Sequence, residues 1–349
     1  MTLDFLTALE KARNTTELNK NEIINLLKAN PEESKLLFQL ADKKRAEYIG
    51  NTVHLRGIIE LSNYCRQNCH YCGLRFENKK LNRYRLSYDE IYDAAEKAIQ
   101  LGYRTLVLQS GEDKHYSPIK IAELVMALKK LDVAITLSLG EHTYETYQLW
   151  REAGADRYLI KHETSNPELF QKIRPGKTLE ERLKCQSWLK ELGYQLGSGC
   201  MVGLPGQNLD ILADDLLLLK KMDVEMAGIG PFIPHPNTPL AGSREGSVEM
   251  TLKMVAIARI IMPFIHLPST TALSTIHPFG RELALQSGAN VVMPNVSPNQ
   301  YRKFYEIYPN KICTKDSSDY SNIIKKIQVL GRTIGTDYGH SPKLKEALN

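Results

Sequence analysis

Eight short β-rich runs recur along the chain, and longer amphipathic segments separate most of them. The runs cover residues 53–61, 105–109, 134–139, 157–161, 195–204, 225–232, 267–273 and 289–295. The segments between them carry helix signals; Ser87, for example, stands three residues before Glu90, which predicts a capping box. Repeated strand–helix alternation predicts parallel strands joined by right-handed crossovers. We therefore predict an α/β fold, a (β/α)8 TIM-type barrel. An open doubly wound sheet is the alternative, because periodicity does not distinguish a closed sheet from an open one.

Residues 1–48 precede this alternation and have helical patterns. Pro31 suits a first helical position, and Gly50 suits the end of the same helix. A chain of 349 residues is long enough for two domains or one large barrel, and no linker interrupts the series of runs. We predict an N-terminal helical extension over 1–48 and a barrel over 49–349, with a loop-and-helix appendage from about residue 296.

The composition excludes several classes of protein. No apolar run approaches the roughly 18 residues of a membrane span, and the mixed N-terminus is not typical of a secretory signal. The net charge of +5 is interpreted as a solvated surface that spreads over both ends of the chain, with no block typical of nucleic-acid binding. Six cysteines, three of them clustered, favour metal or redox chemistry in a reducing compartment. We therefore predict a cytoplasmic protein that binds neither a membrane nor a nucleic acid.

Three of the cysteines lie within eight residues. The stretch CRQNCHYCGLR begins at residue 65 and places Cys65, Cys69 and Cys72 directly after the first run, on a loop where barrel active sites form. A structural zinc site prefers four closing ligands, and His70 is awkwardly placed to be the fourth. Three thiolates on a cubane of four irons instead leave one iron open, as a catalytic metal centre requires.

This C-x3-C-x2-C loop, with the aromatic Tyr71 before its last cysteine, resembles the signature of the radical S-adenosylmethionine (SAM) superfamily. The resemblance implies a [4Fe–4S] cluster held by three cysteines, with the amino and carboxylate groups of SAM on the open iron. An electron from the cluster would then cleave the C5′–S bond, giving methionine and a 5′-deoxyadenosyl radical. A zinc or scaffold site is the alternative.

Stretches at predicted strand ends supply cofactor-binding residues under this resemblance. QSGED at 109–113 is similar to the superfamily's GGE segment, so Glu112 is expected to accept hydrogen bonds from the methionine ammonium. Ser138 and Glu163 suit ribose hydroxyls, and Arg182 suits the methionine carboxylate. An ordinary turn or a solvated charge is the alternative at such positions. The expected cofactor-binding residues are Tyr71, Gln109, Ser110, Gly111, Glu112, Ser138, Glu163 and Arg182.

Longer stretches resemble the HydE family of [FeFe]-hydrogenase maturases in register from about residue 40 to 340. They include LQSGED, TLSLGE, HETSNPELFQKIRPG and GIGPFIPHPNTPL. The resemblance implies a substrate that is a small iron complex carrying two carbonyls, a cyanide and a cysteine, whose sulfur the radical attacks. It also implies two partner maturases and an electron donor. The alternatives are a radical enzyme of the related biotin synthase and methylornithine synthase group, acting on an amino acid or small thiol, and a non-catalytic iron–sulfur scaffold.

Side chains in or after other runs are expected to form the substrate pocket. Arg56 and Arg157 lie in the first and fourth runs and are expected to face the cluster, although an arginine in such a run is most often an edge or salt-bridge residue. Lys161 stands where the HydE family has an arginine and cannot reproduce the planar fork of a guanidinium. No catalytic residue is expected beyond the cluster and SAM. The expected substrate-binding residues are Arg56, Arg157, Lys161, Thr270, Thr271, Met293 and Tyr305.

Cys313, in YPNKIC, is a lone cysteine near the end of the chain. Some members of the resembling family hold a second iron–sulfur cluster there with three cysteines, of which this would be the first. No cysteine follows Cys313 in this sequence. One thiolate does not hold such a cluster, so we expect no second cluster and an unligated Cys313.

Overall fold

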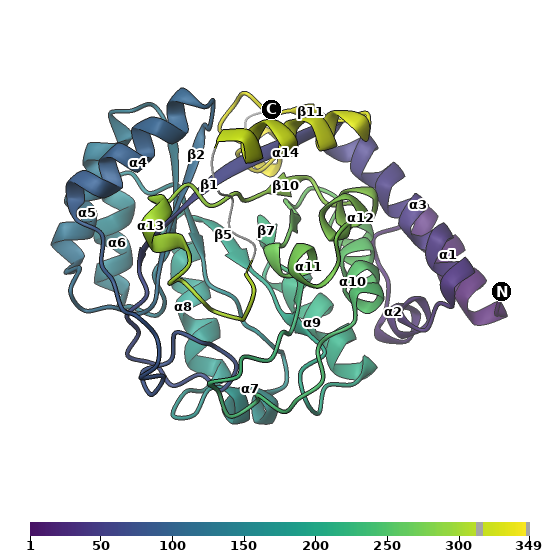
Figure 1. Ribbon diagram of the computed structural model, residues 1–349. Helices are drawn as coiled ribbons and strands as arrows, with labels where there is room; N and C mark the ends of the chain where they lie inside the picture. Colours follow the sequence, from purple (N-terminus) through teal and green to yellow (C-terminus); the bar gives the residue numbers. More distant parts are fainter. Residues whose placement is uncertain (312–316, 347–349) are drawn as a thin grey trace.

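Parallel strands form the centre of the molecule (Figure 1). In the computed structural model, which describes residues 1–311 and 317–346, they are hydrogen-bonded in the order β7-β5-β4-β3-β2-β1-β10-β9. A parallel bridge between Met226 and His266 joins the two ends of this order. The sheet is thus a nearly closed barrel, and the predicted TIM-type fold is confirmed in preference to the open sheet. The strands are β1 Thr52–Ser62, β2 Thr105–Ser110, β3 Ala134–Ser138, β4 Arg157–Leu159, β5 Gln195–Ser198, β6 Met201–Val202, β7 Met226–Ala227, β8 Gly230–Pro231, β9 Pro268–Ser269, β10 Val291–Val292 and β11 Thr333–Ile334.

Each of the eight predicted runs contains a strand, but some runs are interrupted. The fifth run divides into β5 and β6 around Gly199, whose φ of 153° and close approach to the Gly228 carbonyl leave no room for a side chain. The seventh run was predicted as strand to residue 273, which is wrong. Its chain leaves the sheet at Thr270, which has the extended backbone of an N-cap, and α11 begins at Thr271.

Helices surround the barrel on its outside (Figure 1). The capping box predicted at Ser87 and Glu90 is present at the start of α4. Trp150, Tyr147 and Tyr158 are among the largest fully buried side chains, and they pack helix α6 onto β4. None of the helices in the described parts of the chain is long and apolar enough to cross a membrane. The helices are α1 Leu3–Asn14, α2 Lys20–Leu27, α3 Pro31–Tyr48, α4 Tyr88–Gln100, α5 Pro118–Lys129, α6 Tyr144–Glu152, α7 Pro167–Ile173, α8 Leu179–Glu191, α9 Leu209–Lys221, α10 Val248–Ile261, α11 Thr271–Ile276, α12 Gly280–Gln286, α13 Asn299–Arg302, α14 Ser317–Val329 and α15 Lys343–Glu346.

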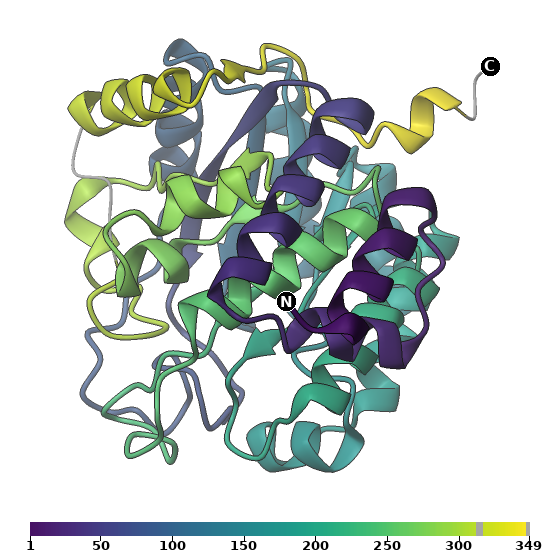
Figure 2. The same ribbon diagram turned by 90° about the vertical axis from the view of Figure 1, so that its right-hand side faces the viewer.

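Two terminal segments pack on this barrel. Helices α1 to α3 lie against its outside, where α2 contacts α9 and α3 contacts α10 (Figure 2). At the other end of the chain, β11 pairs in parallel with the start of β1, Thr52 opposite Thr333. The residues after β11 then cross the amino-terminal end of the barrel, where the backbone carbonyls of Tyr338 and Gly339 accept hydrogen bonds from barrel side chains. The opposite end of the barrel, at the carboxyl ends of the strands, carries the loops that can form a site.

Candidate active site

A cavity of about 390 Å³ lies at the carboxyl ends of the barrel strands. Ser110 and Ser138 line it as the last residues of β2 and β3, and Lys161 lines it just after β4. Sixteen of the eighteen predicted site residues border this one cavity. They are Cys65, Cys69, Tyr71, Cys72, Gln109, Ser110, Gly111, Glu112, Ser138, Lys161, Glu163, Arg182, Thr270, Thr271, Met293 and Tyr305.

The cysteine loop follows β1 and has no helix or strand from residue 63 to 84. A half-buried arginine holds this irregular segment together: Arg83 donates to the carbonyls of Asn63, Leu74, Arg75 and Asn78. Two backbone hydrogen bonds then fix the loop to later elements, His70 N to the Ile173 carbonyl at 2.8 Å and Gly73 N to the Ile307 carbonyl at 2.9 Å. The three thiols are therefore held in place by a folded loop. Arg83 was not predicted.

The three thiols lie in a protein environment that disfavours free thiolates. Burial raises the pKa of Cys65 to about 11, and it raises the pKa of Cys69 and of Cys72 as well. At neutral pH these groups remain protonated unless a cation binds them. Binding of a metal cluster would displace the protons and make all three into ligands.

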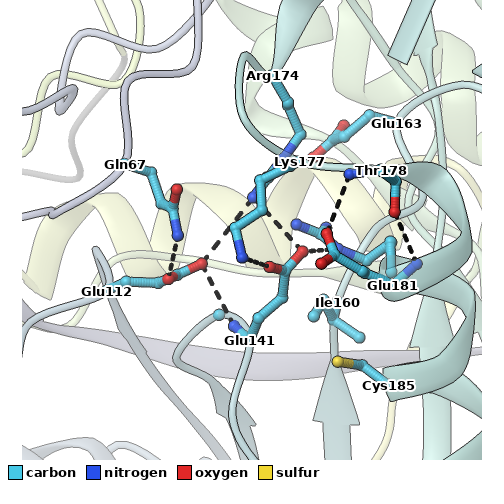
Figure 3. A network of polar contacts seen from close by, with 12 residues as sticks. Gln67, Glu112, Glu141, Ile160, Glu163, Arg174, Lys177, Thr178, Glu181 and Cys185 are labelled. Atoms are coloured by element: carbon cyan, nitrogen blue, oxygen red, sulfur yellow. Dashed lines mark hydrogen bonds and ion pairs between the residues drawn. The ribbon is translucent and has the colours of Figure 1, made fainter. Parts of the chain in front are cut away.

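A network of buried charges forms the wall beside the cysteine loop (Figure 3). Glu112 accepts hydrogen bonds from Gln67 Nε2 at 2.6 Å and from Arg66 Nε at 3.0 Å, and both donors belong to the cysteine loop. Gly111, the residue before it, packs so closely on the Tyr64 carbonyl that a Cβ would overlap that oxygen. Glu112 thus ties the end of β2 to the loop that carries the thiols.

Glu141 is the second carboxylate of this network, and it holds three cations. Its oxygens lie 2.8 Å from Arg182 Nε, 2.9 Å from Lys177 Nζ and 3.6 Å from a terminal nitrogen of Arg174. Burial alone would raise the pKa of Glu141, but Arg182, Arg174 and Lys177 lower it to about 2. Glu141 is therefore ionised at neutral pH and fixes the cations at the cavity wall.

Arg174 has unused hydrogen-bonding capacity in this wall. Its side chain is buried, and neither Nε nor Nη2 has a hydrogen-bond partner among the residues that the structure describes. The carboxylates of Glu112 and Glu141 lie 3.9 and 3.6 Å from Nη2, beyond hydrogen-bonding distance. A buried guanidinium with free donors at a cavity is a receptor for an anion such as a carboxylate.

Glu163 has an unusual backbone, with a φ of 67° that a glutamate rarely adopts. Its amide donates to the Gly199 carbonyl, and its carbonyl accepts from Met201 N, so the residue bridges two parts of the barrel. One carboxylate oxygen accepts from the Tyr71 hydroxyl at 3.4 Å. The other lies 3.3 Å from Lys161 Nζ, without the geometry of a hydrogen bond. A strained residue with an unused acceptor at a cavity is typical of a ligand contact.

A separate polar group lies across the cavity, around Glu60 of β1. Glu60 forms an ion pair with Lys311 and accepts from Asn295 Nδ2 at 2.6 Å. Burial raises the pKa of Glu60 even though Lys311 lies against it. The Lys311 ammonium lies 4.6 Å from the ring centre of Tyr305, which places Tyr305 in this second group. Glu60 and Lys311 were not predicted.

Comparisons with known proteins match this arrangement to one superfamily. A model of the Radical SAM superfamily matches residues 59–219. The [FeFe] hydrogenase maturase subunit HydE of Thermotoga maritima is 53% identical over 317 residues, which covers 90% of this chain and 91% of that protein. The chain belongs to the radical SAM superfamily, in the HydE family.

More distant radical SAM relatives share most of the chain's length. The 3-methylornithine synthase of Methanosarcina acetivorans is 30% identical over 326 residues, which is 92% of both proteins. The crystal structure of a methylornithine synthase superposes with a TM-score of 0.84 at 27% identity and covers 94% of this chain and 97% of that one. The fold is therefore shared by relatives with different activities in their names, so the fold alone does not identify the substrate.

The residues present fit the groups that membership of the radical SAM superfamily implies, a [4Fe–4S] cluster and SAM. In the described part of the chain, no three His, Cys, Asp or Glu side chains converge closely enough to hold a single metal ion. A cubane does not require this, because each thiolate binds a different iron. On the SAM side, Arg174 offers unused donors, and Glu163 offers an unused acceptor.

Two predicted residues of this radical SAM enzyme lie outside the cavity. Arg157 donates to the Tyr338 carbonyl at 2.6 Å and contacts His340 Nδ1 at 2.9 Å, and Arg56 donates to the Gly339 carbonyl at 3.1 Å. The expectation that both arginines face the cluster is wrong. Arg157 is the first residue of β4, and Arg56 pairs with the first residue of β2, so both lie at the amino-terminal end of the barrel. Cys313 lies outside the described residues.

Sequence reasoning also missed residues that complete the site. Glu141 follows Ser138 in the stretch LSLGE, and Arg174 stands in the stretch KIRPG; both stretches were noticed for their likeness to the HydE family. Glu141 lies three residues after the end of β3, which is a signal for a site residue, whereas Arg174 follows helix α7 and has no such signal. Their pairing across two loops could not have been found, because the loop conformations bring them together.

Proposed function

We propose that this radical SAM enzyme is a maturase that assembles the diiron site of [FeFe]-hydrogenase. Its substrate is a cysteine-bound Fe(CO)₂(CN) complex. The observation that carries the proposal is the 53% identity to a HydE over 90% of the chain. The partners of the reaction are two further maturases and an electron donor.

Three cysteines, Cys65, Cys69 and Cys72, hold a [4Fe–4S] cluster and leave one iron for SAM in this proposal. No second cluster is needed. When bound, the cluster and SAM supply a 5′-deoxyadenosyl radical. The chain's own residues hold and orient SAM: Arg182 and Arg174 bind the methionine carboxylate, Glu112 and the backbone of 109–111 bind the ammonium, and Ser138 and Glu163 bind the ribose. Tyr71 holds Glu163 through its hydroxyl.

The substrate would be held by other side chains of the same cavity. Lys161 supplies a cation for its carboxylate, and the buried Thr270 hydroxyl, which has no partner among the described residues, donates a hydrogen bond to it. Thr271, Met293 and Tyr305 complete the wall. Because lysine cannot bind a carboxylate through a planar fork, this enzyme should hold the substrate less rigidly than a relative with arginine.

Anaerobic turnover tests the proposed function. The reduced, reconstituted protein is mixed with SAM and the cysteine-bound iron complex, and 5′-deoxyadenosine and the carbonyl infrared bands are followed. We expect the complex to be consumed and 5′-deoxyadenosine formation to accelerate. Acceleration by an amino acid or a small thiol and not by the complex would assign the chain to the biotin synthase and methylornithine synthase group. No 5′-deoxyadenosine with dithionite would show that the cluster is only carried.

A further inference from the structure

The cysteine-loop segment, residues 64–85, is strongly basic. Residues 64–85 contain six Lys or Arg and one Asp or Glu, whereas the whole chain contains 45 and 40. Basic and acidic residues are therefore equal in number, 39 of each, outside this segment. The expectation that the charge spreads over both ends of the chain is wrong for the N-terminal end, because residues 1–48 contain eight basic and eight acidic residues. Residues 64–85 thus carry a net charge of +5, residues 296–349 carry +4 with nine basic and five acidic residues, and the rest of the chain carries −4.

Part of this charge is used inside the loop. Arg83 binds four backbone carbonyls, and Arg75 pairs with Glu77 at 2.7 Å. The remaining four basic residues are exposed, together with two aromatic rings of the same segment. Arg66 and Arg85 pair with Glu112 and Asp113 at 3.0 and 2.7 Å, whereas Lys79 and Lys80 form no ion pair with the described residues. We call this surface the basic rim; it consists of Tyr64, Arg66, Phe76, Lys79, Lys80 and Arg85.

Cation–aromatic contacts link the residues of the basic rim. The Lys79 ammonium lies 3.9 Å from the ring centre of Phe76, and the Arg85 guanidinium carbon lies 3.8 Å from that of Tyr64. The Phe76 residue is 56% exposed, which is unusual for so large an apolar side chain. Exposed aromatic rings among basic side chains are typical of a surface that binds an acidic protein partner.

The basic rim is the outer side of the loop whose inner side carries the thiols. Tyr64 and Arg66 flank Cys65 in sequence, and Phe76 N donates to the Gln67 carbonyl at 2.8 Å. Only the loop itself therefore separates these side chains from the predicted cluster ligands. SAM and the substrate occupy the cavity side, so an electron reaches the cluster from the outer side without crossing them.

We propose that the basic rim is the docking site of an acidic electron-carrier protein with a flavin or iron–sulfur cofactor. The inference rests on the proposed function, because it requires a cluster that is reduced before SAM is cleaved. In the electron-transfer step, the carrier loses one electron and is oxidised, and the [4Fe–4S] cluster gains that electron and is reduced. Opposite charges steer the two proteins together, which speeds association at low ionic strength.

The test compares two double charge reversals. Lys79→Glu with Lys80→Glu alters the basic rim. Lys43→Glu with Lys44→Glu is the matched control, because it also reverses two adjacent lysines, one of which lies over an aromatic ring, Tyr48. The control pair belongs to α3, on the far side of the molecule from the loop between β1 and α4 (Figure 1). For the wild type and both variants, the rate of 5′-deoxyadenosine formation is measured with dithionite and with a reduced acidic flavodoxin as the electron donor. Each rate is measured at about 50 and about 300 mM salt.

We expect the basic-rim variant to lose about tenfold in flavodoxin-driven rate at low salt, and the wild type to lose a similar factor at high salt. Dithionite-driven rates should remain within about twofold, and the control variant should match the wild type. An unchanged flavodoxin-driven rate in the basic-rim variant, or an equal loss in the control, would overturn the proposal.

Two further measurements separate this proposal from others. A titration of oxidised flavodoxin against the three proteins should show weaker binding for the basic-rim variant alone. If the wild type makes no 5′-deoxyadenosine with dithionite, the proposed function fails. The flavodoxin titration does not depend on that activity, so it still tests the basic rim as a docking site. A basic-rim variant that keeps flavodoxin binding but loses binding of a single-stranded RNA oligomer would assign the surface to nucleic acid and refute the docking site.

Discussion

Arg182 and Glu141 form a buried ion pair at the cavity wall, with Arg182 Nε 2.8 Å from Glu141 Oε1. A second donor of the same guanidinium binds the Lys161 carbonyl, which fixes the plane of the side chain. Arg174, Lys177 and Arg66 bring further positive charge to the same network, against the carboxylates of Glu112 and Glu141. Positive charge thus exceeds negative charge at this wall, and the wall can accept an anionic group without loss of its internal pairs.

Arg174 should contribute to SAM binding through the donors that the protein leaves unused. Arg174→Gln removes them, so the affinity for SAM should fall by about 1–3 kcal/mol, the usual cost of a lost charge-assisted hydrogen bond. Anaerobic calorimetric titration measures this directly. Arg244→Gln, at an exposed position, is the control and should bind SAM as the wild type does. Equal affinity in both variants would remove Arg174 from the cofactor site.

Cys69→Ala should abolish SAM cleavage and leave the barrel folded. Each of the three cysteines supplies one thiolate, and the other two cysteines that the structure describes, Cys185 and Cys200, do not line the cavity. Iron content and 5′-deoxyadenosine are measured after reconstitution, with circular dichroism as the test of folding. Cys185→Ala is the matched control and should keep both iron and activity. A Cys69→Ala protein that still makes 5′-deoxyadenosine would refute the cluster assignment.

Glu163→Gln should weaken SAM binding more than it affects folding. The substitution keeps the size of the side chain and its contact with the Tyr71 hydroxyl, but it removes the negative charge that we expect at the ribose. The affinity should fall by about 1–3 kcal/mol, with little change in thermal unfolding. A loss of thermal stability without a loss of affinity would make Glu163 a structural residue only.

The contribution of Glu141 to stability should depend on pH. Its pKa is lowered from 4.5 to about 2 in the folded protein, so the stabilisation is present above about pH 4.5 and is lost as the pH falls toward 2. The shift corresponds to about 3 kcal/mol at neutral pH. Urea unfolding of the wild type and of Glu141→Gln, both without iron, measures the difference. It should be large at pH 7, fall to less than half near pH 3 and become small near pH 2; a difference that is independent of pH would show that the pairing does not stabilise the fold.

The sequence pattern allowed the barrel and most of the cavity to be predicted, because strand ends of a parallel barrel converge on one face. Ser110, Ser138 and Lys161 could be placed at that face from the ends of their runs alone. The two charges Glu141 and Arg174 could not, because they meet only through the conformation of two loops. Hydrophobic periodicity gives no information about such a conformation.

Arg56 and Arg157 were predicted at the wrong end of the barrel, although for Arg157 its position in the run indicated the correct end. Arg157 begins its run, and the first residue of a parallel strand lies at the end of the barrel opposite the active site. The alternation within a run indicates which side chains face the interior of the barrel, and it does not indicate their depth. Counting from the start of its run would have assigned Arg157 to the amino-terminal end, whereas Arg56 is fourth in a run of nine and its depth follows only from its register with Thr105.

Arg157 should therefore stabilise the fold and have no direct role at the substrate. Its guanidinium joins the start of β4 to the Tyr338 carbonyl and to His340, and so fixes the C-terminal segment across the amino-terminal end of the barrel. Arg157→Ala would leave the Tyr338 carbonyl with fewer donors in a buried place, at a cost of about 2–4 kcal/mol in the free energy of unfolding. The affinity for SAM and the rate of uncoupled SAM cleavage should not change at a temperature where the variant is folded.

Arg157→Lys should recover part of the stability, because an ammonium can still donate to the carbonyl. A variant that is as stable as the wild type but slow with the iron complex would instead return Arg157 to the substrate-binding residues, by an effect transmitted from the far end of the barrel.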